Sequence, residues 1–149
     1  MLDNDCIFCK MIRKEIPATV IYEDDLVLAF MDAMPINPGH SLIIPKQHQQ
    51  FISDIDSEYA ARMFEVARRI DSAIRESAAL GGLKCEALNL MISDGPAASQ
   101  EVYHTHLHVI PRWIGDGVHF QFPNKPKGLL GGDELAFSAE EIKKNLKGL

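Results

Sequence analysis

The spacing of apolar residues predicts strands in the first third of the chain and a helix in the middle. Runs of β-branched and large apolar side chains, typical of strands, occupy residues 19–22, 26–31 and 40–44. Acidic residues separate the first two runs, as in a hairpin, and the Pro- and Gly-containing segment 35–39 predicts a turn before the third. From about Ser57 to Ser77, apolar residues recur at helical spacing, which predicts one long amphipathic helix.

Two further strands and a second helix are predicted beyond it. Residues 87–92 and 102–110 have the composition of strands, and a loop of small and polar residues separates them. Near the C-terminus, Ser138 and Glu141 have the spacing of a capping box, which predicts a short helix starting there. Together these elements predict an α+β fold, with a five-stranded, mainly antiparallel sheet, one long helix and a short C-terminal helix.

Length and charge narrow the class of protein. The chain has 149 residues, and we expect a single domain over 1–149, with its core at about 5–115 and a variable tail at 116–149. Its 15 Lys and Arg residues against 21 Asp and Glu give a net charge of −6, which argues against binding to nucleic-acid polymers. No apolar run approaches the roughly 20 residues of a membrane span, and the acidic start lacks the features of a signal peptide. We therefore expect a cytoplasmic protein without a disulfide framework.

Three histidines at alternate positions, His104, His106 and His108, are the most informative feature of the sequence. Alternate side chains on a strand point to the same face, so the three imidazoles are expected side by side. A polar outer face of an edge strand is the simpler interpretation, but such faces usually carry Thr, Lys or Glu. One metal ion does not explain all three histidines, because the first and third lie about 13 Å apart along an extended strand. The sequence therefore favours different chemical roles for the three histidines.

Cys6 and Cys9 form a C-x-x-C pair near the start of the chain. Such a pair is a common half-site for tetrahedral zinc, and His48 and His104 are the natural candidates to complete it. Two reduced thiols without a metal are one alternative, and a redox-active pair is another, although a redox motif is expected in a βαβ context. Cys85 is expected to be a small buried or partly buried residue outside this group.

His106 and His108 are then available for reaction chemistry. A neutral imidazole is a nucleophile and a general acid or base near neutral pH, so one histidine can attack phosphorus while its neighbour holds the phosphate or protonates the leaving group. The small-residue loop 93–100 directly precedes them, and its backbone N–H groups are placed to cradle an anion. A plain turn between two strands is the alternative interpretation of this loop.

The segment from His104 to Ile110 resembles the signature of the histidine-triad (HIT) family, in which histidines alternate with apolar residues. The resemblance extends over most of the chain, including segments 6–10, 28–32 and 37–46, and fades after Gly117. It implies a HIT-like fold and a nucleotide-binding hydrolase or transferase that acts at the α-phosphate of nucleoside monophosphate derivatives. Members of this size usually form homodimers, which extend the sheet and core across a two-fold axis.

The resemblance also implies roles for individual residues. By similarity, His106 is the nucleophile that carries a nucleotidyl intermediate, His108 contacts the phosphate, and His40 packs behind the triad. The nucleotide-binding positions implied by the family are Ile7, Phe8, Ile16 and Phe30 around the base, Asp32 at the ribose, and Ser93, Ser99, Gln100 and Glu101 around the phosphate and leaving group. In the zinc-containing branch, similar to the Hint group, the metal ligands match Cys6, Cys9, His48 and His104. Four protein ligands imply a structural role for zinc.

Two departures from the family pattern lie in the phosphate loop: Ser93 replaces a more usual Asn, and Ser99 a more usual Gly. Glu101 stands where a Ser or Thr often contacts phosphate, although Glu also occurs there among bacterial-type members. Ser99 adds a Cβ at a position expected to need either close backbone approach or a positive φ.

The expected function is hydrolysis of phosphoramidates or dinucleoside polyphosphates, with a purine, adenosine-containing nucleotide as the substrate. A nucleotide-binding adaptor with little turnover is the alternative, and a redox or metal-handling protein is a third hypothesis. The region after Arg112, which contains Trp113, Asp116 and His119, is expected to shape the leaving-group pocket.

Overall fold

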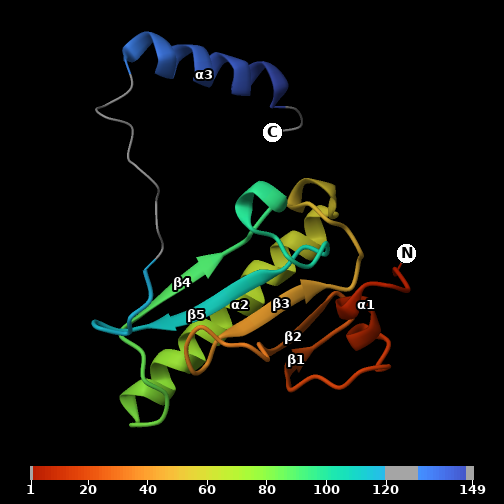
Figure 1. The fold of residues 1–149 in the computed structure, drawn as a ribbon, viewed down its shortest axis with the longest axis vertical. Helices are drawn as coiled ribbons and strands as arrows, with labels where there is room; N and C mark the ends of the chain where they lie inside the picture. Colours follow the sequence, from red (N-terminus) through yellow and green to blue (C-terminus); the bar gives the residue numbers. More distant parts are fainter. Residues whose placement is uncertain (1, 120–130, 147–149) are drawn as a thin grey trace. The chain divides into compact units, whose positions relative to one another are not determined.

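The computed structural model describes residues 2–119 and 131–146 of the chain. Its helices and strands are α1 (Ile7–Ile12), β1 (Val20–Glu23), β2 (Val27–Met31), β3 (Ser41–Pro45), α2 (Ser57–Ala79), β4 (Ala87–Met91), β5 (Leu107–Arg112) and α3 (Gly132–Asn145) (Figure 1). Short 3-10 helices lie at Ile52–Asp54 and Pro96–Ala98. The chain divides into two units, Met1–Gly117 and Val118–Leu149.

The five strands form one sheet in the order β1-β2-β3-β5-β4, and every neighbouring pair is antiparallel. β1 and β2 form the predicted hairpin, and β3 lies at the centre of the sheet. α2 follows β3 and ends before Gly81, whose φ of 78° stops the helix in the left-handed region. The predicted α+β fold, with its long helix and short C-terminal helix, is confirmed. None of the helices in the described ranges is long and apolar enough to cross a membrane.

The sheet buries both of its faces, because its central strands are apolar at consecutive positions. Side chains from β2, β3 and β5 on one face pack against the apolar stripe of α2, which lies across the sheet in Figure 1. The opposite face forms a second cluster around Phe8 of α1, made of Leu28, Phe30, Leu42 and Ile44. Leu107 and Val109 of β5 belong to the α2 side, so His108 between them points to the face that carries α1.

Three element boundaries differ from the predictions. The C-x-x-C segment belongs to α1, which at six residues is too short to produce a helical period. The strand predicted over 102–110 begins only at Leu107, because the backbone before it bonds elsewhere: the amide and hydroxyl of Thr105 both donate to the carbonyl of Gln49. α3 begins at Gly132 rather than at Ser138, whose hydroxyl donates to the Glu134 carbonyl inside the helix. Only His108 of the triad therefore lies in a strand.

The Asp24 carboxylate holds the turn of the β1–β2 hairpin. It accepts hydrogen bonds from the backbone N–H groups of Leu26 and Val27, from the Tyr22 hydroxyl and from Nε of Arg62 on α2. Burial raises the pKa of Asp24, but the Arg62 guanidinium and the other donors outweigh it and lower the pKa from 3.8 to about 2. Its contribution to stability is therefore complete above the unfolded-state pKa and is lost as the pH falls through the folded-state pKa.

We expect Asp24→Asn to lower the free energy of unfolding by about 1–2 kcal/mol at neutral pH, measured by urea denaturation. The difference from wild type should shrink as the pH falls from 3.8 to about 2, because the wild-type carboxylate is then also neutralised. Asp25→Asn is the matched control, because Asp25 is next to Asp24 in the sequence but is exposed, and an exposed position should tolerate the change. A difference that stays constant over this pH range would show that charge at Asp24 is not its cause.

Candidate active site and metal centre

Two sulfur and two nitrogen atoms converge beside α1. Cys6, Cys9, His48 and His104 each offer one ligand atom, and these atoms all lie within 4.8 Å of one another. Nδ1 of His104 is 3.5 Å from Sγ of Cys6 and 3.6 Å from Sγ of Cys9. Nδ1 of His48 is 3.3 Å from both Sγ of Cys9 and Nδ1 of His104. Tetrahedral zinc with usual bond lengths separates two nitrogens by about 3.3 Å and a nitrogen from a sulfur by about 3.6 Å, so the donor set and its spacing fit zinc.

The surroundings of the cluster prepare its ligands for a metal. Nε2 of His104 donates to the Pro45 carbonyl at 2.9 Å, which leaves the lone pair on Nδ1, the atom that faces the cysteines. Burial lowers the pKa of His104 to about 4, so this ring is neutral, as a ligand must be. Nε2 of His48, the nitrogen turned away from the cluster, lies 3.8 Å from the Asp3 carboxylate. The structure thus brings together the four residues expected from the sequence.

His106 and His108 lie side by side next to this cluster, with ring centroids 4.8 Å apart. Nδ1 of His106 donates to the His104 carbonyl at 2.7 Å, because a carbonyl can only accept, and the lone pair is therefore on Nε2. Burial lowers the pKa of both rings, and the neighbouring His106 and His40 help to bring that of His108 to about 4. A neutral ring with a free lone pair is the form of histidine that acts as a nucleophile.

Both histidines line a pocket of about 560 Å³ on the sheet face that carries α1. One part of its wall is apolar, and there the Phe8 ring meets Phe30 and His106 edge to face, at 5.6 and 5.3 Å between centroids. The polar part of the wall comes from Asp32, Thr19, Ser93, Ser99, Glu101, His106 and His108. None of the described residues lining this pocket is a Lys or Arg. An apolar wall beside a few convergent polar groups is the usual form of a small-molecule site.

The loop before the triad folds into a tight turn whose backbone N–H groups bond within it, since those of Ala98 and Gln100 donate to the Gly95 carbonyl and that of Ser99 to the Pro96 carbonyl. Ser99 has a φ of 64°, the left-handed conformation for which its Cβ is unfavourable, and Gly95 has a φ of 100°. The Gln100 side chain is buried, accepts the Gly95 N–H at 2.9 Å and donates to the Gln50 carbonyl at 3.0 Å. Gln100 therefore fixes the shape of the loop from behind.

The structure does not bring all the predicted site residues to the pocket. Ile16, Gln100 and His40 are absent from its described lining, whereas Pro17 and Ala18 beside Ile16 belong to it. His40 is buried behind His108, with its Nε2 3.0 Å from Nδ1 of that ring. Four methionines, Met11, Met31, Met34 and Met91, line the pocket without any sequence signal, because a flexible thioether fits any apolar wall.

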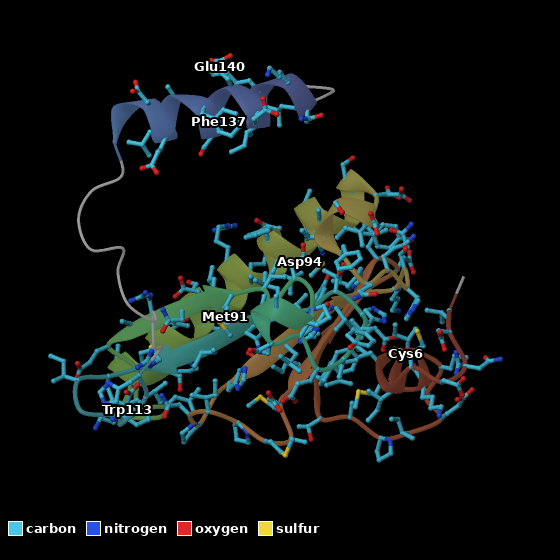
Figure 2. All side chains as sticks on the ribbon, turned by 45° about the horizontal axis from the view of Figure 1, so that its top comes forward. Cys6, Met91, Asp94, Trp113, Phe137 and Glu140 are labelled. Carbon is cyan, nitrogen blue, oxygen red and sulfur yellow. The ribbon has the colours of Figure 1, made fainter. Side chains whose placement is uncertain are left out.

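Residues 113–119 are absent from the described lining of the pocket. Figure 2 shows Trp113 at one end of the first unit and Cys6 at the other. Asp116 instead binds Arg112 at 2.5 Å and accepts from the Asn37 side-chain amide at 3.0 Å. These contacts tie the end of β5 to the turn that carries His40, so the region supports the site from outside it.

Comparison with known proteins places this arrangement in a family. The HIT domain family matches residues 13–113, which include the triad and His48 but begin after Cys6 and Cys9. An uncharacterized HIT-like protein of Borreliella burgdorferi is 45% identical over 123 residues, 81% of this chain and 85% of the relative. Adenylylsulfatase HINT3 of Arabidopsis thaliana is 40% identical over 111 residues, 74% of this chain and 54% of the relative. Adenosine 5'-monophosphoramidase HNT1 of Saccharomyces cerevisiae is 38% identical over 111 residues, 74% of this chain and 65% of the relative.

Solved structures give the same result. The crystal structure of a HIT family member from Bacillus subtilis has a TM-score of 0.86 and 32% identity, covering 98% of this chain and 100% of that one. A Zn-bound histidine triad family protein from Mycobacterium smegmatis has a TM-score of 0.71 and 36% identity, covering 95% of this chain and 98% of that one. With this fold, this triad and these relatives, the chain belongs to the histidine-triad (HIT) family, and Hint proteins are among its relatives.

Proposed function

We propose that this protein is a nucleotidyl hydrolase, which cleaves adenosine monophosphate derivatives at the α-phosphate through a covalent intermediate on His106. The observation that carries this proposal is the state of the His106 ring, whose Nδ1–H is held by the His104 carbonyl while Nε2 keeps its lone pair beside His108 in the pocket. Two relatives are named as an adenosine 5'-monophosphoramidase and an adenylylsulfatase, which supports an adenosine nucleotide as the substrate.

The proposed reaction has two steps at the same phosphorus. In the first, the Nε2 lone pair of His106 forms a bond to phosphorus, and the leaving group departs with the electron pair of its own bond and takes a proton from His108. In the second, water attacks phosphorus and gives a proton to His108, the P–N bond returns its electron pair to His106, and AMP is released. Release of AMP from adenosine 5'-phosphoramidate tests the proposal, since a nucleotide-binding adaptor would bind AMP without this turnover.

We also propose that the cluster of Cys6, Cys9, His48 and His104 holds a structural zinc ion. When bound, zinc supplies a cross-link between α1 and the segments that carry the two histidines, with no position left open for substrate. α1 has only six residues and no side-chain cap at its start, so its position depends on the packing of Phe8 and on this cross-link. Because Ile7 and Phe8 lie between the two cysteines and line the pocket, the cross-link would also hold one wall of the base slot.

A homodimer that continues the sheet is the proposed assembly. β4 lies at the edge of the sheet and has a neighbour, β5, on one side only within the described residues. The other edge strand, β1, directly follows Pro17, Ala18 and Thr19, which line the pocket, so a partner strand there would crowd the site. Leu90 on β4 is 46% exposed, which makes the β4 edge the better place for a two-fold interface.

We expect Leu90→Lys to convert a dimer into a monomer, because a charge would be buried at the centre of the paired β4 edges. Light scattering coupled to size-exclusion chromatography measures the mass directly. Val20→Lys on β1, an equally exposed edge position at 50%, is the control and should remain dimeric. A wild-type protein that is monomeric at all concentrations, or a dimer lost only in Val20→Lys, would contradict this interface.

A further inference from the structure

Nδ1 of the buried His40 has two neighbours with opposite requirements. The backbone N–H of Ile36 donates to it at 3.1 Å, and an oxygen of the Asp32 carboxylate lies 3.3 Å from it. A backbone N–H can only donate and a carboxylate can only accept, so one nitrogen satisfies the first when it carries a lone pair and the second when it carries a proton. The other oxygen of Asp32 accepts the Met34 N–H at 2.9 Å, which holds the carboxylate in place.

The opposite side of the His40 ring leads to the pocket. Its Nε2 lies 3.0 Å from Nδ1 of His108, and His108 lines the pocket. When the two rings share two protons, each ring carries one of them on Nε2. His40 Nε2–H then donates to Nδ1 of His108, and His108 Nε2–H faces the pocket. Nδ1 of His40 has a lone pair and accepts the hydrogen bond from the Ile36 N–H. When the two rings share three protons, the third is on His40 Nδ1 and faces Asp32. Both protonation states of this histidine pair therefore have a hydrogen-bond partner for His40 Nδ1: the Ile36 N–H with two protons and the Asp32 carboxylate with three.

We propose that the His40–His108 pair stores the proton that the leaving group takes, and that Asp32 is the positioning residue that stabilises the proton-loaded pair. The Ile36 amide stabilises the unloaded pair. This inference rests on the proposed hydrolase function and assigns Asp32 a role beyond the ribose contact that the family resemblance implies. Among the charged and titratable groups that face the pair, Asp32 favours loading, whereas His106 and the burial of both rings oppose it.

Over the whole reaction cycle, the His40–His108 pair gives up one proton and takes one back. As the bond from phosphorus to the leaving group breaks, its electron pair takes the proton on His108 Nε2, and two protons remain on the rings. The attacking water returns one proton to His108 Nε2 in the second step, so the pair is loaded again when AMP leaves. In the loaded pair the proton on His40 Nδ1 faces Asp32, so the carboxylate acts without touching the reacting atoms.

The requirement for Asp32 should therefore depend on the leaving group. An amine cannot leave phosphorus as an anion near neutral pH and has to be protonated, whereas p-nitrophenolate leaves without a proton. A ribose contact, in contrast, affects every adenosine substrate equally. The comparison of an amine with a p-nitrophenolate leaving group on the same nucleotide separates these two roles.

The test compares wild type and Asp32→Asn on adenosine 5'-phosphoramidate and on the p-nitrophenyl ester of AMP. Asn keeps the size of the side chain and an acceptor for the Met34 N–H. We expect the fall in kcat caused by Asp32→Asn to be at least about 10-fold larger on the phosphoramidate than on the ester. An equal loss on both substrates, or no loss on either, would overturn the inference while leaving the proposed hydrolase function intact. Failure of the wild type on both substrates would instead contradict the proposed function.

A second measurement keeps the inference testable without turnover. Nitrogen-15 NMR of the imidazoles reports which ring nitrogens carry protons, and we expect His40 Nδ1 to become protonated at a pH at least about one unit higher in wild type than in Asp32→Asn. Equal titration in both proteins would overturn the proposal. So would a second bound metal ion per chain that Asp32→Asn removes, because Asp32, His40 and His108 also have the donor atoms of a metal site.

Discussion

His106→Ala is expected to lower kcat for adenosine 5'-phosphoramidate by roughly 1,000-fold or more, which is the largest effect of any single substitution. The reason is that the variant has no atom to form the covalent bond to phosphorus, while the apolar wall of the pocket is unchanged. Phe8 and Phe30, which line the pocket and are proposed to hold the base, are retained, so the affinity for AMP should stay within about 10-fold of wild type by calorimetry. Loss of turnover with binding retained is the pattern that identifies a nucleophile.

His119→Ala is the matched control, because His119 is exposed and lies outside the described lining of the pocket. It should turn over the substrate at the wild-type rate. If His106→Ala hydrolysed the phosphoramidate as fast as wild type, covalent catalysis by His106 would be wrong. If it lost AMP binding to the same extent as turnover, the substitution would have damaged the pocket, and His106→Asn would then replace it as the test.

Loss of the metal cluster is expected to have the largest effect on stability. Cys9→Ser should reduce bound zinc from about one ion per chain to none and lower Tm by about 10 °C or more, because Cys9 is fully buried and the cross-link to α1 is lost. Atomic emission spectroscopy gives the zinc content and calorimetry gives Tm. Burial raises the pKa of the Cys9 thiol to about 11, so zinc binding displaces a proton and should weaken as the pH falls.

Cys85→Ser is the control for this experiment, since the Cys85 thiol donates to the Ala87 carbonyl and lies outside the cluster. Zinc content and Tm should both be unchanged in it. A Cys9→Ser protein with wild-type Tm would show that the cluster does not hold the fold together. Wild-type protein that contains no zinc after purification and takes up none on addition would contradict the metal site itself.

The sheet and α2 could be predicted from the sequence because their residues repeat at the period of the element they form. β2 and β3 are continuous apolar runs, and the stripe of α2 recurs at helical spacing. α1 could not be predicted, because six residues show no period and its start has no side-chain cap. The strand predicted over 102–110 begins only at Leu107, because the Thr105 amide donates to the Gln49 carbonyl in a loop. Local composition does not encode such a tertiary contact.

The candidate site could be predicted to a similar degree. Alternation indicated the division of labour among the histidines, and the C-x-x-C pair with His48 and His104 indicated the cluster, because ligand type and spacing are local properties. The positive φ of Ser99 was indicated only by the family resemblance, because Ser99 stands where Gly is usual. The position of Gln100 behind the loop, and the two neighbours of His40 Nδ1, depend on which backbone groups meet in space and have no local signal.

The central claim, a nucleotidyl intermediate on His106, is tested most directly by the mass of the enzyme itself during turnover. Wild-type protein mixed with excess adenosine 5'-phosphoramidate and quenched in alkali, which preserves a P–N bond, is expected to gain the mass of one adenylyl group. Peptide mapping should place that group on His106, and His106→Ala should gain none. An adduct on a different residue, or rapid AMP release by a wild-type enzyme that never carries the adduct, would contradict the account.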